Sequence, residues 1–198
     1  IVVYAPKDVL AQMRRVVEEL DRPGSEAAVG RNIEMTLAFL LCSTKTPPEA
    51  RALPADLEPV ARQLRAVTLY KDIRLWDIVP FHLQEGKSME HSLRLPSITP
   101  DVPGAVVTAQ LRIIPESVSR RESGRYVRFE KLSMGLSIPY PAPKPAPGAP
   151  ASLNFQYQQV GLTTSGDFKE GQKSVLGKVS GIDDETAVFA VISLRVLD

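Results

Sequence analysis

The sequence has 198 residues, of which 43% are hydrophobic and 24% are charged, and these are ordinary values for a globular protein. The net charge is +1, from 24 Lys and Arg against 23 Asp and Glu, so no overall field attracts nucleic acid or an anionic membrane. The single cysteine, Cys42, excludes an internal disulfide, and no apolar run is long enough for a membrane-spanning helix.

The chain opens with an apolar run, Ile1–Tyr4, that favours a strand, and a helical pattern follows it. Apolar residues recur there at spacings of one, three and four: Val9, Leu10, Met13, Val16, Val17 and Leu20. Pro23 and Gly24 end this helix, because proline cannot continue the hydrogen-bond ladder and glycine accepts a positive φ. Since the chain starts inside an apolar strand, we expect a longer precursor from which a signal peptide has been removed.

Residues 32–41 alternate with a period of two, which predicts a half-buried strand that becomes apolar on both faces near its end. A second helix follows, with Asp56 as its N-cap and Pro59 in its first turn. Its apolar stripe is Leu57, Val60, Ala61, Leu64 and Val67. The first part of the chain is therefore predicted to form a strand, a helix, a strand and a helix, and a further strand follows.

That further strand covers residues 71–83, and Pro80 restricts it to a sheet edge or a bulge. Strict alternation would place two sets of side chains on opposite faces: Ile73, Leu75, Val79 and Phe81 on one, and Arg74, Trp76 and Ile78 on the other. The strand completes a βαβαβ half in which two helices cover a small sheet.

From residue 88 onward no helical period remains. Six strand-like runs follow: Ser88–Leu95, Ala105–Ile114, Arg125–Ile138, Ser152–Leu162, Lys173–Val179 and Ala187–Val196. Turn signals separate them, which predicts an antiparallel sheet or sandwich, and the Pro-rich segment 139–151 favours a stiff, extended loop between two of the strands. We therefore predict an α+β fold with a βαβαβ half at 1–84 and an antiparallel β half at 85–198.

No motif for catalysis or nucleotide binding is recognisable. Gly86-Lys87-Ser88 resembles the end of a phosphate-binding loop, but Phe81 stands where its first glycine is required. His82 and His91 would face each other across a hairpin turning at Glu85-Gly86 and, with nearby carboxylates, could hold a metal ion. Two exposed strand histidines are the commoner arrangement, so we predict no cofactor and keep this metal site as an alternative.

Four arginines gather around a turn at Ser123-Gly124: Arg120, Arg121, Arg125 and Arg128. They could contact phosphates or an acidic partner, but only Tyr126 and Phe129 are interleaved with them, so we interpret them as the polar surface of a hairpin. Nucleic-acid binding through a KH-like arrangement is disfavoured as well, because a Gly-rich phosphate clamp and a basic surplus are both missing.

The two ends of the chain resemble bacterial secretins. The opening strand-helix-strand, with Val2, Val3, Leu10, Val16, Leu20, Asp21, Pro23, Ile33 and Glu34, is similar to that of secretin periplasmic domains. The last residues are similar to the end of a secretin β-domain, through Phe168, Gly171, Val175, Leu176, Gly177 and Val188–Val196. Secretin barrels carry a paired glycine where this chain has Gly177-Lys178, and the sequence lacks the long amphipathic strands that line a secretin pore. The resemblance implies an envelope protein that works by protein–protein contact, and it does not imply a pore.

We therefore predict a non-enzymatic periplasmic or secreted module for protein–protein interaction or assembly, through a protein partner or self-association, without nucleic acid. Candidate protein-binding side chains are the large apolar and aromatic residues Trp76, Ile78, Tyr126 and Tyr157, for which positions in the core are an equally good explanation. The alternative function is a small-ligand or metal-binding protein, or an enzyme, with its site around His82 and His91.

Overall fold

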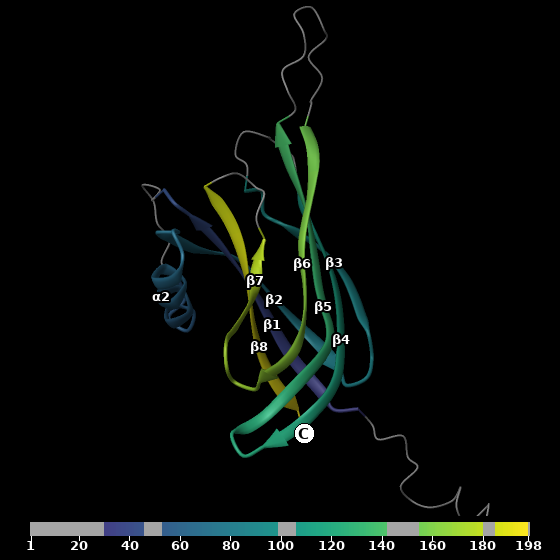
Figure 1. Cartoon of the computed structure of the whole chain (residues 1–198). Helices are drawn as coiled ribbons and strands as arrows, with labels where there is room; N and C mark the ends of the chain where they lie inside the picture. The colour runs from purple at the N-terminus through teal and green to yellow at the C-terminus, as the bar shows by residue number, and fades with distance from the viewer. Residues whose placement is uncertain (1–29, 46–52, 99–105, 142–154, 180–184, 198) are drawn as a thin grey trace, which may run out of the picture. The chain divides into compact units, whose positions relative to one another are not determined.

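The computed structural model describes residues 30–45, 53–98, 106–141, 155–179 and 185–197 (Figure 1). The chain divides into two compact units, Ile1–Gly30 and Arg31–Asp198, and every described helix and strand belongs to the second. The strand expected at 1–4, the helix expected at 9–20 and most of the Pro-rich segment lie outside the described residues.

The described part of the chain contains eight strands and one helix. They are β1 (Asn32–Ser43), α2 (Glu58–Val67), β2 (Asp72–Gln84), β3 (Met89–Leu95), β4 (Val107–Arg121), β5 (Gly124–Pro141), β6 (Phe155–Lys169), β7 (Ser174–Val179) and β8 (Thr186–Leu197). All six strands predicted after residue 88 are present, and the second predicted helix is α2. No helix among the described residues is long and apolar enough to cross a membrane.

The strands form two antiparallel sheets, with strand orders β2-β1-β8-β7 and β3-β4-β5-β6. β1 pairs with β8 along its whole length, from Asn32 opposite Leu197 to Ser43 opposite Thr186. The α+β prediction with a separate βαβαβ half is therefore wrong: the fold is mostly antiparallel β, and the strands before residue 84 share a sheet with the last two strands. Alternation along β1 shows that it is a strand, but it does not show which strand pairs with it.

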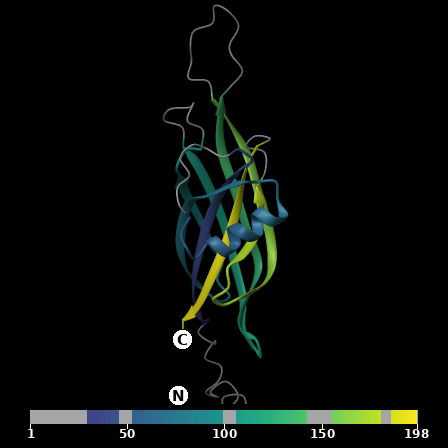
Figure 2. The same cartoon turned by 90° about the vertical axis from the view of Figure 1, so that its left-hand side faces the viewer.

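The two sheets face each other across one large core, and α2 covers the outer face of the β2-β1-β8-β7 sheet (Figures 1 and 2). β1 and β8 are therefore buried on both faces over half their length. Alternate side chains of the two strands face the other sheet, and those between them lie beneath α2: Ala38, Leu40, Cys42, Ala187, Phe189 and Val191. The α2 side chains that pack on this second cluster are Leu57, Val60, Ala61 and Leu64.

A β-bulge changes the faces of β2. Leu40 lies opposite Leu75 and Phe39 opposite Asp77, which leaves Trp76 as the extra residue. The alternation predicted for this strand is consequently wrong across the bulge: Leu75, like Ile73, lies under α2, whereas Val79 and Phe81 belong to the core between the sheets. Pro80 is tolerated because β2 is an edge strand.

Two glutamates join strand ends of the two sheets. Glu85, in the β2–β3 turn, accepts hydrogen bonds from the backbone N–H groups of Arg31 (3.1 Å) and Val118 (2.8 Å). Glu170, in the β6–β7 turn, accepts one from Arg125 Nε (2.7 Å) and one from the N–H of Val196 (2.8 Å). Hydrogen bonds to a charged acceptor are stronger than neutral ones, so these carboxylates fix the turns at which the chain passes from one sheet to the other.

Candidate functional site

The four edge strands of the two sheets differ in how they are protected against pairing with other chains. β2 has its bulge and Pro80, and β3 has only seven residues, two of them charged. β7 has six residues and includes Lys178. β6 has fifteen residues, and none of the first twelve, 155–166, is charged or a proline. The bulge in the β5–β6 pairing has its extra residue on β5, between Phe129 and Leu132. Long edge strands without charge or proline are the ones that pair with a further strand, so β6 is the candidate site.

From Leu132 to Pro141, β5 holds β6 in one continuous register. The outward-facing side chains of the pair are polar and uncharged: Ser133 Oγ lies 2.9 Å from Thr163 Oγ1, and Gln159 Nε2 donates to Ser137 Oγ at 2.9 Å. Side chains between these positions, such as Leu162, pack against the core. A slip by one residue would exchange the polar and apolar faces, so the register of the candidate strand is well determined.

A pair of glycines brings β5 and β6 close together. Gly135 lies opposite Gly161, and a Cβ atom at Gly161 would lie 2.5 Å from the carbonyl oxygen of Met134, whereas a Cβ at Gly135 would have no neighbour within 4 Å. Beside Gly135 the exposed face of this sheet is hollowed by about 540 Å³, and Gln110 and Arg112 are among the lining residues. At Gly161 the backbone of β6 therefore lies so close to the backbone of β5 that no side chain fits between them.

Gly161→Ala should lower the free energy of unfolding by about 1–3 kcal/mol, because the new methyl group must push β6 away from the backbone of β5. Gly135→Ala, its matched control in the opposite strand, should change stability by less than about 0.5 kcal/mol. Urea unfolding of both variants measures the difference. Equal stabilities of the two variants would contradict the close approach at Gly161.

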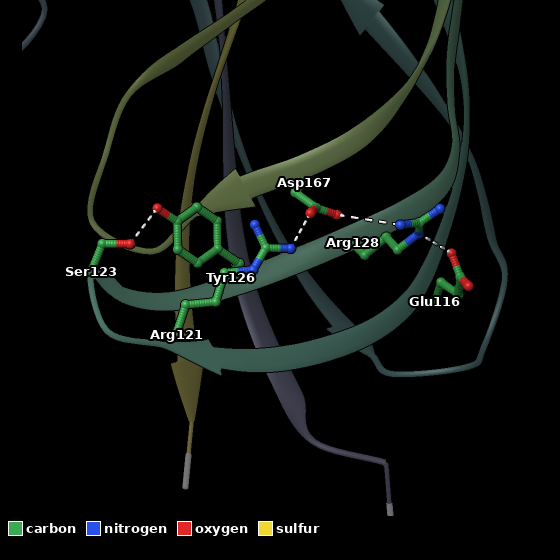
Figure 3. Close-up of polar contacts among 6 residues, drawn as sticks. All are labelled: Glu116, Arg121, Ser123, Tyr126, Arg128 and Asp167. Carbon is green, nitrogen blue, oxygen red and sulfur yellow. Dashed lines mark hydrogen bonds and ion pairs between the residues drawn. The ribbon is translucent and has the colours of Figure 1, made fainter.

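The charges near β6 lie at its end and are balanced by the β4–β5 hairpin (Figure 3). Asp167 accepts a hydrogen bond from Arg121 and lies 3.9 Å from Arg128 Nη1, and Arg128 Nε donates to Glu116 at 2.7 Å. The Arg121 guanidinium also lies 4.5 Å from the centre of the Tyr126 ring. Three members of the hairpin's arginine cluster, including Arg125 with Glu170, therefore pair with carboxylates of their own chain.

The four predicted protein-binding side chains lie in different places. Trp76 packs edge-on against Phe39, with 6.1 Å between ring centres, and its indole N–H donates to the carbonyl of Pro96. Tyr126 is half-buried in the hairpin. Ile78 is 42% exposed and Tyr157 is 50% exposed. Tyr157 belongs to the candidate strand β6, so it is the one of the four that lies at the candidate site.

The structure does not bring His82 and His91 together as ligands. The His91 ring contacts Phe81, with 5.8 Å between ring centres, whereas His82 follows Phe81 in β2 and therefore points to the opposite face of that strand. In the part of the chain that the structure describes, no three His, Cys, Asp or Glu side chains are grouped to hold a metal ion. Burial raises the pKa of the Cys42 thiol to about 12, so this thiol stays protonated at neutral pH.

The uncharged run of β6 was missed as a functional signal in the sequence. It is visible there as twelve positions, 155–166, with no charge and no proline. A run of this composition also suits an inner strand, and only the strand order shows that β6 lies at an edge.

No protein-family model and no curated protein matches the sequence. The solved structures that match include the type II secretin GspD of enteropathogenic Escherichia coli, with a TM-score of 0.46 and 13% identity, over 99% of this chain and 76% of that one. The chain is similar to secretins. The injectisome secretin InvG of Salmonella matches with a TM-score of 0.39 and 10% identity, over 98% of this chain and 71% of that one.

The type IV competence pilus secretin PilQ of V. cholerae matches with a TM-score of 0.41 and 12% identity, over 97% of this chain and 66% of that one. The resemblance to secretins that we inferred from the two ends of the sequence is thus confirmed. Because these TM-scores lie below 0.5, no functional property is transferred with it.

Proposed function

We propose that this chain is a non-enzymatic, secretin-like module of the cell envelope, periplasmic or secreted, that assembles through protein–protein contact. The observation that carries the proposal is the edge strand β6, with fifteen residues and an uncharged run at 155–166. The contact is strand addition, in which a further strand continues the β3-β4-β5-β6 sheet.

The partner strand that suits β6 best is the β6 of a second copy. Two identical edges meet antiparallel around a two-fold axis, and each then presents the same backbone groups and the same side chains to the other. Gln158 and its neighbours bring amide and hydroxyl groups to such a contact and no charge that would repel its own copy. Main-chain hydrogen bonds supply the affinity, and the alternation of polar and apolar side chains sets the register.

The chemistry of the remaining residues supports a non-enzymatic role. Cys42, the only thiol of the chain, is buried and protonated and is not a nucleophile at neutral pH. Three of the four arginines of the hairpin are engaged with carboxylates, as described above. The envelope location belongs to the proposal because the resemblance of both sequence ends to secretins implies it.

Sedimentation velocity of the full chain over a range of concentrations tests the proposal. The unchanged chain should associate, and the double variant Gln158→Lys with Ser165→Lys should remain a monomer, because two exposed lysines on each β6 repel the second copy and disfavour strand pairing. We expect the apparent dissociation constant to rise by about 10-fold or more, which corresponds to about 1.4 kcal/mol.

A matched control places the same two charges on the inner strand β4 of the same sheet, as Thr108→Lys with Gln110→Lys. This control should associate like the unchanged chain. A chain that is monomeric at every concentration, or a control that loses association as fully as the β6 variant, would contradict the proposal.

A further inference from the structure

Two large apolar side chains at the end of α2 are almost fully exposed. Val67 is 80% exposed and Leu69 is 84% exposed, whereas the other exposed large apolar residues of the described part lie between 39% and 50%. Val67 continues the stripe of α2 that Leu64 belongs to, but it lies outside the cluster that this stripe covers. The helix therefore ends in an uncovered apolar tip, defined here by Val67 and Leu69 and called the α2 tip.

The surroundings of the α2 tip carry a local surplus of positive charge. Three carboxylates, in the first turn of α2 and at or beside the starts of β2 and β8, each have a cation partner, in the pairs Glu58–Arg65 (2.9 Å), Asp72–Arg74 (3.5 Å) and Glu185–Lys45 (2.7 Å). Arg62 and Lys71, both exposed, have no carboxylate within ion-pair distance in the described ranges. The net charge of the whole chain is only +1, so other parts of the sequence balance these two cations.

We propose that the α2 tip docks on an anionic phospholipid surface. Exposed apolar side chains flanked by lysine and arginine are the composition of interfacial membrane-binding segments: the apolar groups enter the boundary between headgroups and acyl chains, and the cations contact the headgroup phosphates. Val67 and Leu69 provide the apolar part, and Arg62 and Lys71 provide the charge.

The form of the patch favours lipid over a protein groove as its partner. A protein interface of ordinary affinity needs an apolar centre with a complementary surface around it, and the tip offers two side chains at the end of a helix. A lipid surface adapts its shape to a small projecting tip and supplies the negative charge that complements Arg62 and Lys71. The proposal is independent of strand pairing at β6.

Co-sedimentation of the full chain with vesicles tests the proposal. Vesicles of phosphatidylcholine with added phosphatidylglycerol should bind the chain at least about 10-fold more tightly than phosphatidylcholine vesicles alone, and added salt should weaken this binding. Val67→Ser with Leu69→Ser should reduce binding about 10-fold or more because it removes the apolar contact. Arg62→Glu with Lys71→Glu should abolish the preference for the anionic lipid while the apolar residues remain.

The matched control is Ile78→Ser with Val175→Ser, which removes two exposed apolar side chains of β2 and β7 that are not part of the α2 tip. Neither Ile78 nor Val175 belongs to the α2 tip, so this control should bind the anionic vesicles like the unchanged chain, and circular dichroism should show all variants folded. Absence of vesicle binding by the unchanged chain would overturn the proposal, as would equal binding to both kinds of vesicle or equal losses in the tip variant and the control.

Discussion

Phe39→Ala should lower the free energy of unfolding by about 3–5 kcal/mol, the largest effect that we expect from a single substitution in this chain. Phe39 is fully buried in β1, between the neighbouring strands β2 and β8, and its ring packs edge-on against Trp76. Alanine leaves a cavity in the core between the two sheets, and both sheets contribute side chains to that core. Urea unfolding followed by the fluorescence of Trp76, the only tryptophan, measures the loss.

Tyr157→Ala provides the control, because this aromatic ring is half exposed on β6. We expect a loss below about 1 kcal/mol for it. A loss below about 1.5 kcal/mol for Phe39→Ala would show that this ring is not surrounded as the structure places it, because aromatic truncations in packed cores cost more than that.

Leu64→Ala should lower the free energy of unfolding by about 2–5 kcal/mol, and Val67→Ala, three residues along the same stripe of α2, should change it by less than about 0.5 kcal/mol. Leu64 is 6% exposed and packs over β1 and β8, whereas Val67 is 80% exposed. The two substitutions therefore compare a covered and an uncovered position on one helical face.

The rate at which Cys42 reacts with a thiol reagent measures locally how firmly α2 is held over the sheet. Cys42 lies beneath α2 in the same cluster as Leu64, and its thiol is buried and protonated at neutral pH. Loosening of the helix by Leu64→Ala should raise the labelling rate, and Val67→Ala should leave it unchanged. Labelling at equal rates in both variants would mean that α2 does not cover Cys42.

Local patterns in the sequence were enough to find the strands and α2. Alternation located β1 and β2, and spacings of three and four located the helix that carries Leu64. β1 becomes apolar on both faces near its end, and the structure explains this because α2 covers its second face there.

Those local patterns do not predict which strands pair or where bulges occur. One extra residue, Trp76, places the side chains before it on the other face of β2. Alternation with a period of two does not reveal such an insertion in the sequence. The pairing of β1 with β8 joins residues more than 140 positions apart, which local periodicity does not record. Because the edge position of β6 follows from the strand order, the candidate site could be recognised only after the topology was known.

During synthesis, β1 is made before β8, its partner on one side. β1 leaves the ribosome more than 140 residues before its neighbour on one side, residues 186–197. Until β8 has been made, the growing polypeptide keeps an apolar strand without that neighbour, a situation that slows folding and exposes nascent chains to aggregation. A chain cut short before Thr186 would lack an inner strand of one sheet, so we expect a truncation there to be as damaging to the fold as one within β1.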